Sequence, residues 1–269
     1  MVAHVSCLAE QAKILCDEAE ENNLDMKVFN ERWRRWHTCG LCEQEYHGVV
    51  CCALGWACWK TYVGRPETDS PRMNAIRQLG NGLCAAGHHE DALSVQAAQL
   101  SMERRLGASE ESLLITQENF ANSYGRLGRL EEALLMQQGV YSGRVKLHGE
   151  EHFTTLIAAY NYASSLVVLG RFEETKVLLR KTIPMARGVL GECHDITIKM
   201  RWIYGGALYQ DPGATLDDLR EAVTTLDDAA LIARRVLGGA HPLTVGIERS
   251  LQNTRFVLSA REAGEDVAS

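Results

Sequence analysis

The chain has 269 residues, a formal net charge of −7 and 46% hydrophobic residues. An acidic chain with no basic run lacks the electrostatic footprint of a nucleic-acid-binding protein, and the sequence contains no apolar run of the roughly 18 residues that a membrane-spanning helix needs. Its N-terminus also lacks the basic and apolar regions of a secretory signal. We therefore expect a cytoplasmic protein with no nucleic-acid partner and no membrane partner.

Residues 1–46 are predicted to form an N-terminal helical segment that contains cysteines. Apolar residues at helical spacing predict one helix over Cys7–Asn22 and a second over about Leu24–Trp36. The second helix would carry three aromatic residues on one side: Phe29, Trp33 and Trp36. Seven of the nine cysteines lie before residue 59. An odd number of cysteines in a chain of this length argues against a secreted disulfide scaffold, so we expect reduced thiols or a metal site.

The order His4-x-x-Cys7 followed by Cys39-x-x-Cys42 resembles the second half of a RING-CH (RING-variant) zinc finger. The resemblance implies zinc as a cofactor, with His4, Cys7, Cys39 and Cys42 as ligands. In that family the two pairs serve different zinc ions, and upstream cysteine pairs complete both sites. Because a structural zinc needs four ligands, these four residues would have to rearrange onto one ion. The implied function is a ubiquitin-ligase adaptor whose remaining residues select the substrate.

Two other interpretations of the cysteines stay open. The spacing Cys39-x2-Cys42-x4-His47-x4-Cys52 matches that of a retroviral-type zinc knuckle. Alternatively, residues 47–62 form a helix in which the cysteines at 51, 52 and 58 are small apolar side chains, the common fate of buried free cysteine.

Residues 47–261 are predicted to form an array of helix pairs. Two 42-residue blocks between Leu106 and Val189 repeat each other, so that Leu127-Gly128-Arg129 in the first is matched by Leu169-Gly170-Arg171 in the second. Repetition at this period is the signature of stacked helix pairs. The template also fits residues 69–105, and it predicts four pairs closed by a helix from Pro242 to about Ala260.

Other details of the array follow from the same template. The helix over 47–62 is apolar on most sides and is expected to be a buried first layer. The glycines at 87, 128 and 170 stand where one helix stops and the chain reverses, which favours a left-handed conformation. An insertion at 210–215 lengthens one loop, after which Thr215 and Asp218 cap the next helix. Residues 262–269 are expected to fray.

Three junctions, at residues 148–155, 190–197 and 237–244, share the pattern Gly-x-x-His-x-x-Thr. With the 42-residue period, this pattern resembles the tetratricopeptide repeat in its kinesin-light-chain form. The resemblance implies an all-α, right-handed superhelical solenoid of antiparallel helix pairs. Since His152, His194 and His241 recur with the repeat, we interpret them as turn or helix-start residues and not as metal ligands.

In tetratricopeptide arrays the first helix of each pair lines the concave face. The resemblance therefore implies a partner-binding groove lined by Arg77, Asn81, Glu118, Asn122, Tyr160, Ser164 and Trp202. Amides and aromatic side chains suit a protein partner or an extended peptide better than a small-molecule substrate. The alternative is that Tyr160 and Trp202 only fill packing gaps. The sequence shows no catalytic motif, so the predicted function is a non-catalytic protein-protein interaction scaffold.

Overall fold

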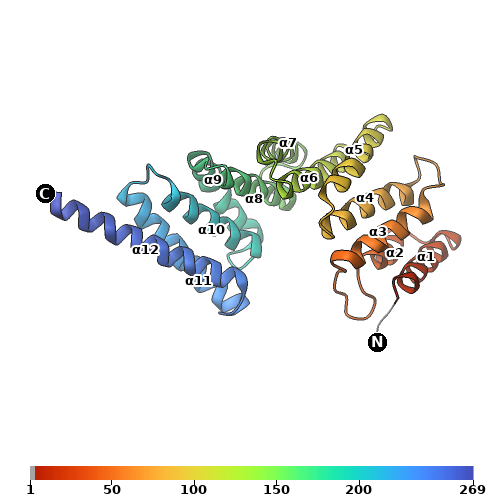
Figure 1. Cartoon of the computed structure of the whole chain (residues 1–269), viewed down its shortest axis with the longest axis horizontal. Helices are drawn as coiled ribbons and strands as arrows, with labels where there is room; N and C mark the ends of the chain where they lie inside the picture. Colours follow the sequence, from red (N-terminus) through yellow and green to blue (C-terminus); the bar gives the residue numbers. More distant parts are fainter. Residues whose placement is uncertain (1–3, 269) are drawn as a thin grey trace. The chain divides into compact units, whose positions relative to one another are not determined.

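The computed structural model describes residues 4–268, in which the regular structure is helical apart from one antiparallel bridge between Thr38 and Glu45 (Figure 1). The chain divides into two compact units, Met1–Ala133 and Leu134–Ser269, here called unit 1 and unit 2. The predicted all-α class is confirmed. None of the helices in the described range is long and apolar enough to cross a membrane.

Unit 1 begins with three elements that precede the repeats: α1 (Val5–Glu21), α2 (Met26–Trp33) and the short 3₁₀ helix η1 (Arg34–Trp36). Five further helices follow, of which the last lies mostly in unit 2: α3 (Gly48–Tyr62), α4 (Ser70–Ala85), α5 (His89–Arg105), α6 (Glu110–Arg126) and α7 (Leu130–His148). The predicted second helix is thus α2 followed by η1. Its last turn tightens because the backbone N–H groups of His37 and Thr38 both donate to the carbonyl of Arg34.

An aromatic cluster holds the N-terminal segment together. The ring of Trp33 lies 5.8 Å from that of Phe29 and 5.3 Å from that of Tyr62, measured between centroids. Trp36 is fully buried beside them. The predicted clustering of Phe29, Trp33 and Trp36 on one side is confirmed. Because Tyr62 belongs to α3, the cluster joins the N-terminal segment to the first layer of the array.

Helices α3 and α4 pack with their backbones in close contact. A Cβ atom at Gly55 would lie 2.9 Å from the carbonyl oxygen of Gln78, and one at Gly82 would lie 2.8 Å from the carbonyl oxygen of Cys51. No larger residue fits at either position unless a backbone moves. On its other side α3 is less buried than predicted, since Trp56 is 44% exposed and Val49 is 76% exposed.

The reversals between paired helices share one geometry. The glycines have positive φ, with +83° at Gly87, +74° at Gly128 and +70° at Gly170. In each turn the residue after the glycine donates its N–H to the carbonyl five positions earlier, as in Arg129 to Tyr124 at 3.0 Å. This is the Schellman pattern, and it confirms the predicted left-handed turns.

Unit 2 contains most of α7 and five further helices: α8 (Phe153–Val168), α9 (Phe172–Leu190), α10 (Asp195–Gln210), α11 (Leu216–Leu237) and α12 (Pro242–Ala268). The capping box is present, since Asp218 N–H donates to Thr215 Oγ1 at 3.1 Å and Thr215 N–H donates to Asp218 Oδ2 at 2.9 Å. The last helix continues to Ala268, beyond the end expected near residue 260.

The repeated histidines stand at helix starts, as predicted. Nδ1 of His152, His194 and His241 accepts the backbone N–H two residues later, at 3.3, 3.2 and 3.2 Å respectively. An imidazole nitrogen here takes the place of the usual side-chain oxygen, and it satisfies a backbone donor that the first helical turn leaves unpaired.

The turn geometry predicts opposite effects for two neighbouring glycines. Gly128→Ala should lower the free energy of unfolding by about 1 kcal/mol, because alanine is strained at positive φ. Gly125→Ala should raise it by roughly 0.5–1 kcal/mol, because Gly125 is helical and a Cβ there meets no atom within 4 Å. Urea unfolding followed by circular dichroism measures both, and equal changes would contradict the assignment of the turn.

Candidate functional site

A groove of about 580 Å³ lies in unit 1 between α4 and the N-terminal segment. One wall is a single face of α4, formed by side chains three, four and seven positions apart along the helix: Asn74, Arg77, Gln78, Asn81 and, one turn further, Ala85. The opposite wall comes from α2, η1, α3 and the loop between η1 and α3: Asn30, Trp33, Arg34, His37, Glu45, Tyr46, His47 and Cys51.

Two contacts fix the α4 wall. Helix α4 begins at a side-chain cap, since the Asp69 carboxylate accepts the N–H of Arg72 at 3.0 Å. The Gln78 side chain donates to the carbonyl of Trp36 at 3.3 Å and so ties the two walls together at the base of the groove. Asn81 is exposed, which leaves its carboxamide open to solvent at the surface of the groove.

Arg77 has a structural role as well as a place in the groove. Its guanidinium donates to Glu103 Oε1 and to Ser112 Oγ, both at 3.2 Å, and to Asn74 Oδ1 at 3.2 Å. Glu103 is fully buried and also accepts from Gln99 at 2.9 Å. A buried carboxylate is costly unless it is paired, so Arg77 is the countercharge that α5 needs at this position.

The opposite wall carries two histidines and an arginine. Burial lowers the pKa of His37, while the nearby Glu45 carboxylate raises it and Arg34 lowers it. The neutral imidazole is therefore favoured at neutral pH. Its Nδ1 is buried and has no hydrogen-bond partner within the part of the chain that the structure describes. This wall therefore contains a buried polar atom without a partner, near the exposed cation of Arg34.

Cys39 and Cys42 lie together in the loop that follows η1. Backbone N–H groups of Leu41 and Cys42, with the Cys42 thiol, lower the pKa of Cys39. Among the described residues, no three histidine, cysteine, aspartate or glutamate side chains come together as a metal site. Neither predicted zinc set is therefore assembled: His4 and Cys7 lie at the start of α1, while His47 and Cys52 belong to the start of α3.

The cysteines of α3 match the third interpretation. Cys51 and Cys58 are buried and Cys52 is partly buried against Leu79 and Leu83. Burial raises the pKa of all three thiols, which disfavours the thiolate that a metal site would require. Their place in the helical seam is that of small apolar residues.

The structure brings together two of the seven predicted groove residues, Arg77 and Asn81. Glu118 and Asn122 lie on α6 in the same unit, but they do not line this groove. Tyr160 and Ser164 lie on α8 in unit 2, where the Ser164 hydroxyl donates to the carbonyl of Tyr160 at 2.9 Å. Lys199 lies over the Tyr160 ring, 5.9 Å from its centroid.

Trp202 supports the packing alternative. Its indole N–H donates to Ser250 Oγ of α12 at 2.9 Å, and its ring lies against Gly246, where a Cβ atom would come within 2.9 Å of the ring. The ring is partly buried against the apolar cluster that contains Ile198 and Ile247. Trp202 therefore anchors the capping helix, and its apolar surface is largely used within the chain.

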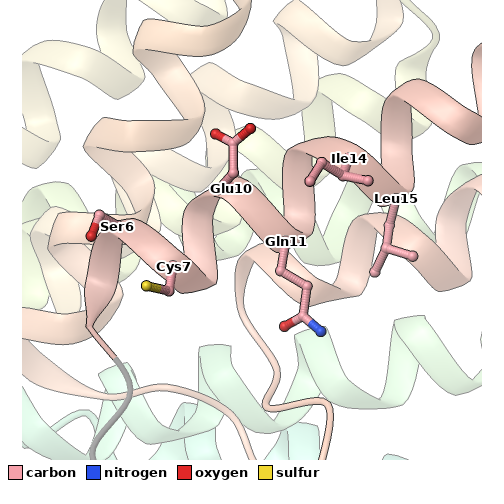
Figure 2. Close-up of a pocket in the computed structure, with 6 residues that line it drawn as sticks. All are labelled: Ser6, Cys7, Glu10, Gln11, Ile14 and Leu15. Atoms are coloured by element: carbon pink, nitrogen blue, oxygen red, sulfur yellow. The ribbon is translucent and has the colours of Figure 1, made fainter.

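A second hollow, of about 490 Å³, follows the outer face of α1 (Figure 2). All six of its residues come from that one helix: Ser6, Cys7, Glu10, Gln11, Ile14 and Leu15. Its lining is mostly apolar, and Ile14 is 47% exposed. Because a single helix forms it, this hollow is a shallow strip that lacks the two walls of the groove on α4.

Some of the groove residues that we did not predict could have been found from the sequence. Asn74 lies three residues before Arg77 on the same helix face, so helical spacing could have added it. The wall from Asn30 to His47 could not have been found in this way, because its place depends on how residues 1–62 pack against α4.

Residues 113–154 match the family model of the tetratricopeptide repeat. Among solved structures, the chain resembles a single-substitution variant of nearly identical TPR-like repeats, assigned to a kinesin light chain, from Podosopora anserina, at 18% identity over 87% of this chain and 98% of that one, with a TM-score of 0.57. It also resembles BtubC (BKLC) from P. vanneervenii, at 12% identity over 97% and 93% of the chains, with a TM-score of 0.51.

A third similar structure is a Rap protein complexed with Competence and Sporulation Factor, at 14% identity over 95% of this chain and 72% of that one, with a TM-score of 0.54. None of the curated protein sequences matches the chain. At these identities the likeness establishes the fold alone, a solenoid of TPR-like helix pairs, as predicted. The family match lies outside residues 1–46, so it gives the RING-CH resemblance no support.

The buried ion pair predicts a stability cost for removing Arg77. Arg77→Ala should lower the free energy of unfolding by about 3 kcal/mol, because it leaves the Glu103 carboxylate buried without its countercharge. In a Glu103→Gln background the same substitution should cost clearly less, since no charge is stranded. Urea unfolding of the wild type, the two single variants and the double variant gives a double-mutant cycle. Equal losses of unfolding free energy in both backgrounds would show that Arg77 and Glu103 are not coupled.

The contacts of Trp202 predict a loss of stability in unit 2. Trp202→Ala should lower the free energy of unfolding by about 2 kcal/mol, because it exposes the apolar seam between α10 and α12. The loss is smaller than for the removal of a fully buried tryptophan side chain. The matched control is Phe256→Ala on α12, where the ring is 76% exposed and the change should stay within about 0.5 kcal/mol. A Trp202 variant as stable as the control would indicate that the ring is free for a partner.

Proposed function

We propose that this chain is a non-catalytic, cytoplasmic interaction protein that binds an extended segment of a partner protein in the groove of unit 1. The observation that carries the proposal is the set of polar side chains in the groove, which combines four carboxamides with the cations of Arg34 and Arg77. The four carboxamides are Asn30, Asn74, Gln78 and Asn81.

The chemistry of the lining favours a peptide over a small molecule. A carboxamide both donates and accepts hydrogen bonds, so it can pair with the N–H and C=O groups that an extended backbone presents. Gln78 is already bonded to the Trp36 carbonyl, which leaves Asn30 and Asn81 as exposed amides on opposite walls. Small-molecule sites of comparable volume are lined mainly by apolar and aromatic side chains.

The fold supports the same function. Stacked helix pairs build extended surfaces for binding, and catalysis is not their usual role. One structural neighbour, the Rap protein, is complexed with Competence and Sporulation Factor. Arg77 and Asn81 are the predicted groove residues that this proposal retains, and Asn30, Asn74 and His37 join them. A role for Glu118, Asn122, Tyr160 and Ser164 remains a separate prediction.

The proposal predicts that Asn81→Arg blocks the groove without unfolding the protein. Asn81 is exposed and a bulky cation there would project over the α4 wall. Peptides selected from a random twelve-residue library on the wild-type protein should bind this variant roughly tenfold more weakly, a difference of about 1.4 kcal/mol. Fluorescence polarisation measures the affinity, and circular dichroism confirms that the helices persist.

The matched control is Asn253→Arg, the same change at an exposed position of α12 in unit 2. It should leave the affinity for the selected peptides unchanged. If both variants bind equally well, or if the library yields no peptide, the groove is not the binding site that we propose.

A further inference from the structure

The loop between η1 and α3 is an ordered turn that holds two cysteines. Thr38 and Glu45 form an antiparallel bridge across its base. Two backbone hydrogen bonds close it, from Cys39 N–H to the Gln44 carbonyl and from Tyr46 N–H to the His37 carbonyl, both at 2.8 Å. The turn passes through Glu43, whose φ of +57° is unusual for a residue other than glycine. The positions of the two cysteines are therefore set by the backbone.

The two cysteines lie on the same turn and are accessible. The Glu43 N–H donates to the Cys39 carbonyl at 3.0 Å, so both cysteines lie on one tight turn. The backbone N–H groups of Leu41 and Cys42, together with the neighbouring Cys42 thiol, lower the pKa of Cys39. The N–H of Leu41 also donates to Cys39 Sγ at 3.5 Å. Cys42 is exposed and Cys39 is partly exposed, whereas Cys16, Cys51 and Cys58 are buried. This pair therefore combines two cysteines on one turn with access to a reagent in solution.

Nothing else in the described structure completes a metal site around the pair. Four ligands are needed for a structural zinc, and no third histidine, cysteine or carboxylate side chain of the described residues joins these two. Two adjacent thiols without further ligands can still be linked by oxidation.

We propose that Cys39 and Cys42 are a redox-active pair that forms a reversible disulfide with a low-molecular-weight disulfide as the oxidant. The Cys39 sulfur, having lost its proton to solvent, attacks one sulfur of the small disulfide, whose S–S bond breaks and releases a thiol. The Cys42 sulfur then attacks Cys39 in the mixed disulfide and releases the second thiol. The chain loses two electrons and two protons, and one small disulfide becomes two thiols.

The same loop forms part of the groove, so oxidation changes one of its walls. His37, Glu45 and Tyr46 line the groove from the base of the turn. Burial and the neighbouring Cys39 thiol raise the pKa of Tyr46, so the thiol pair lies beside this wall. A disulfide to Cys42 moves the Cys39 sulfur away from Tyr46, and the displaced wall binds peptide less well. This second step rests on the proposed function, whereas disulfide formation does not.

The test uses the full chain and oxidised glutathione. After oxidation and blocking of the remaining thiols, peptide mass mapping should find Cys39 and Cys42 joined, with the loss of two hydrogens, and dithiothreitol should reverse the change. In Cys42→Ser the reaction should stop at a glutathione adduct on Cys39. The control Cys193→Ser, at another exposed cysteine, should leave the Cys39–Cys42 disulfide unaffected.

Three outcomes would contradict the proposed disulfide between Cys39 and Cys42: separate glutathione adducts on both residues of the wild type, a pair that stays reduced while Cys7 and Cys193 react, or stoichiometric zinc that protects both thiols.

The effect of oxidation on the groove is measured with the library-selected peptides. Oxidation should weaken their binding by about threefold or more in the wild type and leave it unchanged in the double variant Cys39→Ser/Cys42→Ser, which has no thiol in this loop. Equal affinity before and after oxidation would refute the coupling but not the disulfide. A library without binders would refute the proposed function alone.

Discussion

The close backbone contact between α3 and α4 is the constraint on which the groove of unit 1 depends. Gly55 and Gly82 let the two helices approach until a Cβ atom at either position would meet a carbonyl oxygen of the other helix. This contact brings α3 against the first helix of the repeats, and the aromatic cluster around Trp33 and Tyr62 brings the rest of the N-terminal segment with it. The segment thereby becomes the second wall of the groove.

A polar side chain of unit 1 can stabilise the core and line the groove at once. Arg77 faces the groove, yet its guanidinium is also the countercharge of the buried Glu103. A residue with both tasks cannot be exchanged freely, because losing it strands a charge. Asn81 has no such duty in the core and is exposed. The two predicted residues on this wall therefore differ in kind, and in the proposed function recognition falls mainly on the amides.

The thiols show how one residue type takes different roles within a short segment. Cys51 and Cys58 are buried in the helical seam and keep their protons, because burial raises their pKa. Cys39 lies in a turn whose amides point at its sulfur, and its pKa is lowered. The spacing of the cysteines alone suggested zinc, but a metal site requires that ligands converge, which spacing does not ensure.

The sequence by itself determined the helix pairs, the left-handed glycine turns, the histidine positions at helix starts and the capping box at Thr215, because each depends on residues within a few positions of one another. It also placed Arg77 and Asn81 on one helix face. Only the tertiary structure decided that Trp202 packs on Gly246 of α12, that Arg77 pairs with Glu103, and that the loop with Cys39 and Cys42 flanks the groove. These contacts join residues that are distant in the chain. The packing of whole helices sets which distant surfaces meet, and local residue spacing does not specify that packing.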